Sequence, residues 1–153
     1  MKLYIGSDHA GFEMKRELIT FLSESGFDVV DCGPNVYDPE DDYPDYVSVV
    51  AKNISEDVSK DIESFGIVIG KSGQGEAMVA NRFPNVRCTV FYGGSKHVLM
   101  LSREHNNANM LSLGANFLTN VEARQAIELW LNTKFSGDAR HVRRIRKIEN
   151  IKI

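Results

Sequence analysis

The 153-residue chain has little of what marks the specialised classes of protein. Its two cysteines, Cys32 and Cys88, are too few for a disulfide scaffold and favour the reducing cytoplasm. The apolar runs are only a few residues long, whereas a membrane helix needs roughly 20. The first residues contain one cation and no apolar core, so we expect no signal peptide. A net charge of −3 argues against nucleic acid as a partner.

Short apolar runs alternate with helical patterns along the whole chain. We expect strands near residues 3–5, 27–30, 65–69, 86–91 and 108–113, and helices near 14–22, 44–58, 75–82, 94–104, 120–134 and 138–150. This alternation is typical of βαβ units, and the nearly continuous apolar strands indicate burial on both faces. We therefore predict an α/β fold with a mostly parallel sheet of about five strands, in one domain over residues 1–153.

Polar and glycine-rich residues follow several of the expected strands. They lie at residues 6–11, 70–76 and 93–95, and ligands of open parallel sheets bind beyond the carboxyl ends of the strands. The backbone N–H groups of residues 70–76 could surround an anion, although a plain tight turn has the same composition. Gly66 is one residue too close to Gly70 for a P-loop, and residues 6–11 lack the middle glycine of a dinucleotide fingerprint. Neither a nucleoside triphosphate nor NAD is supported.

Glu76 directly follows the glycine-rich loop and allows two interpretations. Partial desolvation would raise the pKa of its carboxyl group toward that of a general base. Alternatively, Glu76 is a first-turn residue that complements the helix dipole, which would lower the pKa.

Histidine and arginine supply further candidates. His9 and His105 could transfer protons at neutral pH, or could simply lie at the surface near helix ends. The four histidines show no metal-ligand spacing, so we predict no metal site. Arg140 and Arg144 are one turn apart on a basic helix, where two guanidinium groups suit a phosphate. The alternative is a solvated basic helix end that offsets the C-terminal dipole.

Five segments together resemble one family. They are residues 6–12, residues 42–46, the glycine loop continuing to residue 82, residues 105–109, and the pair Arg140 and Arg144. In this order, over nearly the whole chain, they are similar to the family of ribose-5-phosphate isomerase B, which includes the galactose-6-phosphate isomerase subunits.

The resemblance implies a fold, an assembly and a reaction. The fold would be a Rossmann-like α/β/α sandwich, and the assembly a homodimer or a dimer of dimers whose sites use residues of two copies. The reaction would be an aldose–ketose isomerisation, an intramolecular oxidoreduction of a sugar phosphate without metal or cofactor. We predict that it interconverts ribose 5-phosphate and ribulose 5-phosphate through a cis-enediolate. The alternatives are a six-carbon substrate, such as allose or galactose 6-phosphate, and a non-catalytic phosphosugar-binding subunit.

The resemblance also implies roles for individual residues. Glu76, His105 and Ser72 would be catalytic: Glu76 as the base, His105 to open the furanose ring, and the Ser72 hydroxyl to help hold the oxyanion. The substrate-binding residues would be Asp8, His9, Lys71, Ser72, Gly73, Gln74, Gly75, Asn106, Asn116, Arg140 and Arg144.

The chain departs from the family pattern at three positions. Many members carry a cysteine base where this chain has Gly70, and a second subgroup uses a glutamate at the position of Glu76. Members often have an arginine where we align Asn116, so a phosphate contact is missing or is replaced, for example by Lys71.

Overall fold

The computed structural model describes residues 1–151 and contains one parallel sheet flanked by helices. The strands are β1 (Lys2–Ser7), β2 (Asp28–Asp31), β3 (Ser64–Gly70), β4 (Cys88–Phe91) and β5 (Met110–Gly114). The helices are α1 (Phe12–Glu24), α2 (Tyr43–Ser59), α3 (Gln74–Ala80), α4 (His97–Glu104), α5 (Asn120–Asn132) and α6 (Ala139–Glu149), and a 3₁₀ turn, η1 (His9–Gly11), precedes α1. The predicted α/β fold with five strands is confirmed.

Two strands begin later than the apolar pattern predicts. Val86 and Ala108 are buried, but they precede β4 and β5 by two residues. Each follows an asparagine with left-handed backbone, Asn85 (φ 64°) or Asn107 (φ 46°), a conformation that asparagine tolerates and that interrupts an extended chain. The apolar side chains therefore reach the core from turns.

The strand order is β2-β1-β3-β5-β4, and every pair is parallel. The chain proceeds outward in opposite directions from the central β1–β3 pair, which makes the carboxyl ends of these two strands the switch point of the sheet. Ser7 at the end of β1 is in register with Ile69 at the end of β3.

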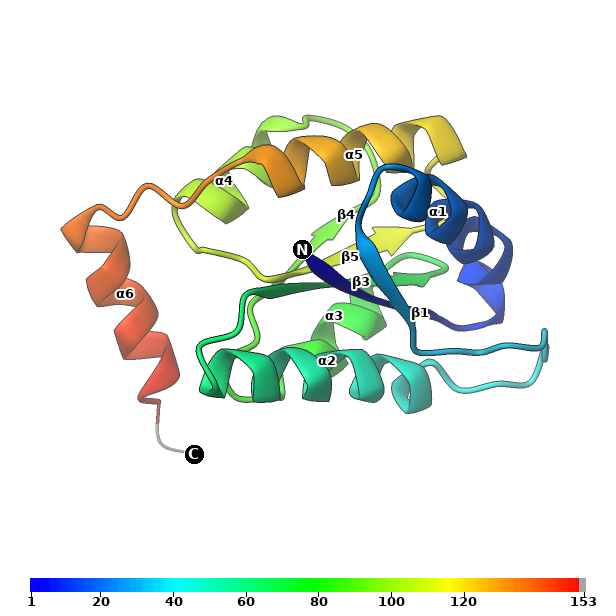
Figure 1. Cartoon of the computed structure of the whole chain (residues 1–153), viewed down its shortest axis with the longest axis horizontal. Helices are drawn as coiled ribbons and strands as arrows, with labels where there is room; N and C mark the ends of the chain where they lie inside the picture. The colour runs from blue at the N-terminus through cyan, green and yellow to red at the C-terminus, as the bar shows by residue number, and fades with distance from the viewer. Residues whose placement is uncertain (152–153) are drawn as a thin grey trace.

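Helices cover both faces of the sheet (Figure 1). Helices α1, α4 and α5 bury one apolar cluster, which includes Leu18, Leu99 and Trp130. Helices α2 and α3 bury a second cluster on the opposite face, including Val50 and Ala80. Every residue of β3 is buried, as expected for a strand covered on both faces.

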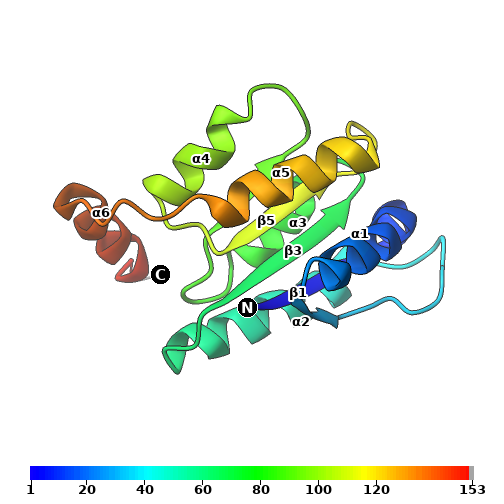
Figure 2. The same ribbon diagram turned by 45° about the horizontal axis from the view of Figure 1, so that its top comes forward.

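Helix α6 stands away from the sandwich, beside the edge of the sheet where the strands begin (Figures 1 and 2). His141 is its only buried residue. The Glu149 carboxylate anchors the helix end, because it pairs with Arg87 Nη1 at 2.6 Å and accepts a bond from the Asn85 amide at 3.2 Å. Among the described helices, none combines the length and the apolar character needed to cross a bilayer.

Candidate active site

Loops after β1, β3 and β5 meet at the carboxyl edge of the sheet. The amide of Asp8, just after β1, donates to the carbonyl of Ile69 in β3 at 3.4 Å. The amide of Asn116, after β5, donates to the carbonyl of Lys71, after β3, at 3.1 Å. The structure thus brings Asp8, the glycine loop and Asn116 together, as the parallel topology requires.

Glu76 lies in the first turn of α3, and its side chain folds back against Gly70. The residue is 4% exposed. A Cβ atom placed on Gly70 would be 1.7 Å from Oε1 of Glu76, so only glycine leaves room for this carboxylate. A cysteine at position 70 would therefore require the Glu76 carboxylate to move away from this position.

Burial raises the pKa of the Glu76 carboxyl group above its ordinary value of 4.5. Its own backbone N–H opposes the shift, and the nearby Asp8 carboxylate adds to it. The direction is the one expected for a desolvated general base, and it is opposite to the direction expected if the helix dipole dominated.

The loop between β3 and α3 presents backbone N–H groups. Gly73 has φ +77°, and its carbonyl accepts a bond from the Ser112 hydroxyl at 2.6 Å, which fixes the turn. Ser72 Oγ accepts from the amide of Gln74 at 3.4 Å. No described residue accepts a hydrogen bond from the amides of Lys71, Ser72 or Gly73. These free donors lie on the loop that carries Glu76.

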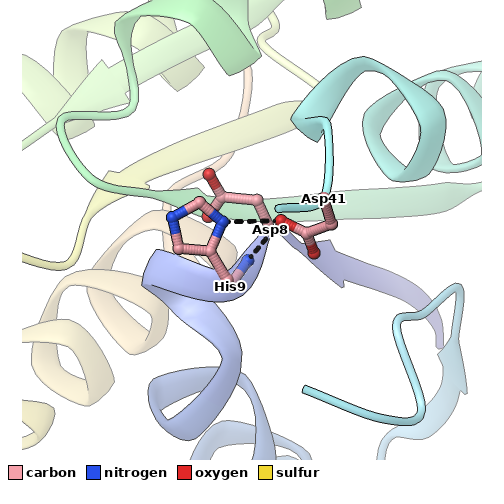
Figure 3. Close-up of side chains that lie close together, drawn as sticks. All are labelled: Asp8, His9 and Asp41. Carbon is pink, nitrogen blue, oxygen red and sulfur yellow. Dashed lines mark hydrogen bonds and ion pairs between the residues drawn. The ribbon is translucent and has the colours of Figure 1, made fainter. Parts of the chain in front are cut away.

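The start of η1 holds a compact polar cluster (Figure 3). Asp8 Oδ1 accepts bonds from the amides of Ala10 at 3.0 Å and Gly11 at 3.2 Å, so this oxygen caps the turn. His9 donates twice to Asp41 Oδ1, from its amide at 3.0 Å and through Nδ1 at 2.6 Å. Asp41 precedes α2 and is 32 residues from His9 in sequence.

The remaining predicted site residues lie at the opposite end of the strands, where the strands begin. They are His105, Asn106, Arg140 and Arg144. His105 ends α4 and Asn106 follows it, before β5 begins. The five residues of β5 span about 16 Å, so they separate this group from the residues that follow the strand. Arg140 and Arg144 belong to α6, beside the same edge (Figure 1). One chain therefore holds two groups of predicted site residues that do not meet.

His141 links His105 to Arg140. The rings of His105 and His141 stack with centroids 4.3 Å apart and planes 12° apart. Arg140 Nε donates to His141 Nε2 at 3.3 Å. Desolvation lowers the pKa of His141, and electrostatic repulsion by His105 and Arg140 lowers it further, which suits a neutral ring that accepts from arginine.

Among the residues that sequence reasoning missed, three contact His9, Asn106 or His105. Asp41 is one of several acidic residues in its loop, and nothing in the sequence separates it from the others. Arg87 Nε donates to the carbonyls of Asn106 at 3.1 Å and Asn107 at 3.0 Å, a tertiary contact without a local pattern. His141 had one usable signal, its position between the two arginines.

Comparison with known proteins identifies the family of this chain. The sequence model of the Ribose/Galactose Isomerase family matches residues 3–148. The chain belongs to the ribose/galactose isomerase family. Ribose-5-phosphate isomerase B of Mycolicibacterium paratuberculosis is 41% identical over 146 residues, which is 95% of this chain and 87% of that protein.

Solved structures of the ribose/galactose isomerase family agree. Ribose-5-phosphate isomerase B of Mycoplasma genitalium, with bound ribulose-5-phosphate, has a TM-score of 0.89 at 36% identity and covers 97% of this chain and 93% of that one. The ribose 5-phosphate isomerase of Thermotoga maritima has a TM-score of 0.87 at 35% identity, with 98% coverage of both chains. The predicted family resemblance, fold class and enzyme class are confirmed, while the roles of individual residues stay predictions.

Proposed function

We propose that this chain interconverts ribose 5-phosphate and ribulose 5-phosphate, with Glu76 as the general base. The proposal depends above all on the buried Glu76 carboxylate, which packs against Gly70 beside Asp8 on a loop with free amides. The ribulose-5-phosphate bound to the Mycoplasma genitalium relative supports the choice of substrate.

In the aldose-to-ketose direction, the Glu76 carboxylate removes the proton from C2 of the open-chain sugar. The electrons of the C–H bond form the C1=C2 bond, and the carbonyl oxygen on C1 becomes the oxyanion of a cis-enediolate. A proton then passes from the C2 oxygen to the C1 oxygen. As the oxyanion on C2 becomes a carbonyl, the electrons of the C1=C2 bond take the proton that Glu76 returns to C1. A base with a raised pKa suits both steps, since it must accept and then return a proton near neutral pH.

The glycine loop would stabilise the charge that develops on oxygen. The amides of residues 71–75 and the Ser72 hydroxyl are the proposed donors, and losing one such donor typically lowers the rate by about 10²–10³-fold. Because these donors are fixed by the Gly73–Ser112 bond, little reorganisation is needed during the reaction.

A second copy of the chain would complete the site. His105, which would open the furanose ring, and Asn106, Arg140 and Arg144 lie at the far edge of the sheet from Glu76 in one chain. In a two-fold dimer each copy would supply Glu76 to one site and His105 to the other. We therefore propose a homodimer with two shared sites.

A six-carbon sugar phosphate is the second candidate substrate, and Asn116 is the observation that favours it. Asn116 is exposed just after β5, and its backbone amide donates to the Lys71 carbonyl. It is shorter than the arginine that family members often carry, which leaves more room for a longer sugar.

Turnover of pentose and hexose phosphates in deuterated water tests the function. Ribose 5-phosphate and ribulose 5-phosphate should interconvert with deuterium uptake at the reacting carbons. Glu76→Gln should lower both rates at least ~10²-fold, the lower end for losing general-base catalysis, while substrate still binds. Glu13→Gln, at an exposed carboxylate in α1, is the matched control. Turnover of hexose phosphates alone, or near-normal exchange in Glu76→Gln, would contradict the proposal.

A further inference from the structure

His9 is held by a single buried carboxylate from a distant part of the chain. The side chain of Asp41 is 3% exposed, whereas that of His9 is 36% exposed. Asp41 Oδ1 accepts both the amide and the Nδ1 bond of His9, and Oδ2 is buried with no hydrogen-bond partner among the described residues. Within residues 1–151, His9 is thus the only residue that forms hydrogen bonds to this carboxylate.

Asp8, His9 and Asp41 offer ligand atoms within 4.8 Å of one another, which is also a geometry for a cation. Two observations favour hydrogen bonding. The 2.6 Å between His9 Nδ1 and Asp41 Oδ1 is a hydrogen-bond length, and ligands of one metal at about 2.0–2.2 Å from it lie farther apart than that. Asp8 Oδ1 is already occupied by two backbone amides.

We propose that Asp41 is a positioning residue for His9, which keeps Nδ1–H bound and leaves Nε2–H free to donate to the phosphate of the substrate. The inference rests on the proposed function, in which Asp8 and His9 bind the sugar phosphate. The second ring nitrogen of His9 points away from Asp41 (Figure 3). Because Asp41 accepts one bond from the backbone amide and one from Nδ1, it holds the ring in a fixed orientation relative to the backbone of His9.

The same contact controls the charge of the ring. The hydrogen bond to Asp41 raises the pKa of His9 above 6.5, desolvation opposes this, and the charges of Asp8, Asp41 and Glu40 add to it. Asp8 belongs to the turn of His9, and Asp41 and Glu40 belong to the loop before α2. An imidazolium with one free N–H is a stronger donor to a phosphate dianion than a neutral ring.

The first test is an NMR titration of the His9 ring, assigned with His9→Gln. In the wild-type chain the Nδ1 proton should remain hydrogen-bonded, and the pKa should lie above 6.5. Asp41→Asn should lower this pKa, whereas Glu40→Gln, which removes a charge from the same loop but no bond to His9, should change it little. An unchanged pKa in Asp41→Asn, or a wild-type ring unprotonated at Nδ1 at neutral pH, would overturn the proposal.

The second test uses binding. Asp41→Asn should raise KM for ribose 5-phosphate and weaken inhibition by inorganic phosphate about 10-fold just above pH 6.5, the lower end for losing a charge-assisted hydrogen bond. The effect should shrink as pH falls below 6.5, the ordinary pKa of histidine, because the ring then gains its proton without Asp41, and kcat should change less than KM. In the His9→Gln background, Asp41→Asn should add no further loss.

Equal losses in both backgrounds would show that Asp41 acts without His9 and would overturn the proposal. The outcome is separable from that of the proposed function. If the chain isomerises no pentose phosphate, the titration and the affinity for inorganic phosphate still test Asp41.

Discussion

At Glu76, the features that suit catalysis oppose stability. A carboxyl group with a raised folded-state pKa binds more protons in the folded than in the unfolded chain between pH 4.5 and its folded pKa. Its contribution to stability is therefore fully present below pH 4.5 and is lost as pH rises through the folded pKa. Above that pH the buried charge destabilises the fold.

We predict that Glu76→Gln stabilises the protein at neutral pH. Its Tm should exceed that of the wild type at pH 7–8, and the difference should disappear as pH falls below about 4.5, the ordinary pKa of the carboxyl group. Thermal unfolding across this range, with Glu13→Gln as the exposed control, measures the effect. A Gln variant less stable at neutral pH would indicate that Glu76 instead serves the helix dipole.

We predict that Gly70→Ala displaces the Glu76 carboxylate, since the new methyl group would overlap Oε1. Overpacking of this kind costs about 1–3 kcal/mol, and the displaced base should lower kcat by roughly 10²-fold. Urea unfolding of Gly70→Ala, Glu76→Ala and the double variant gives the coupling. Gly70→Ala should cost less stability in the Glu76→Ala background, and an equal cost in both would contradict the contact.

At the residue scale, the sequence supports two interpretations of Glu76, and only the tertiary structure separates them. The decisive contact is between the Glu76 carboxylate and Gly70, and it depends on where the first turn of α3 lies relative to the end of β3. The Asp41–His9 pair is still harder to predict from the sequence. Its two residues are 32 positions apart, and the loop of Asp41 contains several equivalent carboxylates.

At the element scale, all five strands and six helices follow from periodicity and composition. The central strands β1, β3 and β5 are easy to recognise because they are buried on both faces. The errors lie at the ends: β4 and β5 begin after left-handed asparagines, and α4 begins at His97, after the positive-φ residues Gly93 and Gly94. The apolar periodicity does not mark such turns, although glycine and asparagine are the residues that adopt them most readily.

Helix α6 is the element whose proposed role is the easiest to isolate. We predict that Arg144→Ala raises KM strongly and lowers kcat less, because phosphate contacts change little between ground and transition states. The loss of a charge-assisted bond corresponds to a rise in KM of about 10–150-fold. Steady-state kinetics with Arg146→Ala, another exposed arginine of α6, is the control. If neither Arg140→Ala nor Arg144→Ala changes KM or phosphate inhibition, α6 is only a solvated basic helix.

At the scale of the whole molecule, the main feature is the separation of the two groups of site residues. Parallel topology explains why Asp8, Glu76 and Asn116 share one edge of the sheet, and this much could be predicted from the sequence. Nothing in composition or periodicity predicts that a second copy would have to supply His105 and Arg144 to the site of Glu76. That expectation came from the family resemblance. Its physical reason is that the two groups of site residues lie at opposite ends of β5.

Mixing two inactive variants tests the central claim of a shared site most directly. Glu76→Gln and His105→Ala each remove one residue of the proposed shared site, from opposite ends of the strands. Exchanged dimers would carry one wild-type site and one doubly substituted site. Isomerase activity should therefore return to about a quarter of the wild-type value after statistical exchange at equal concentrations. Exchanged dimers, verified by native mass spectrometry, that stay as inactive as either variant alone would contradict the account.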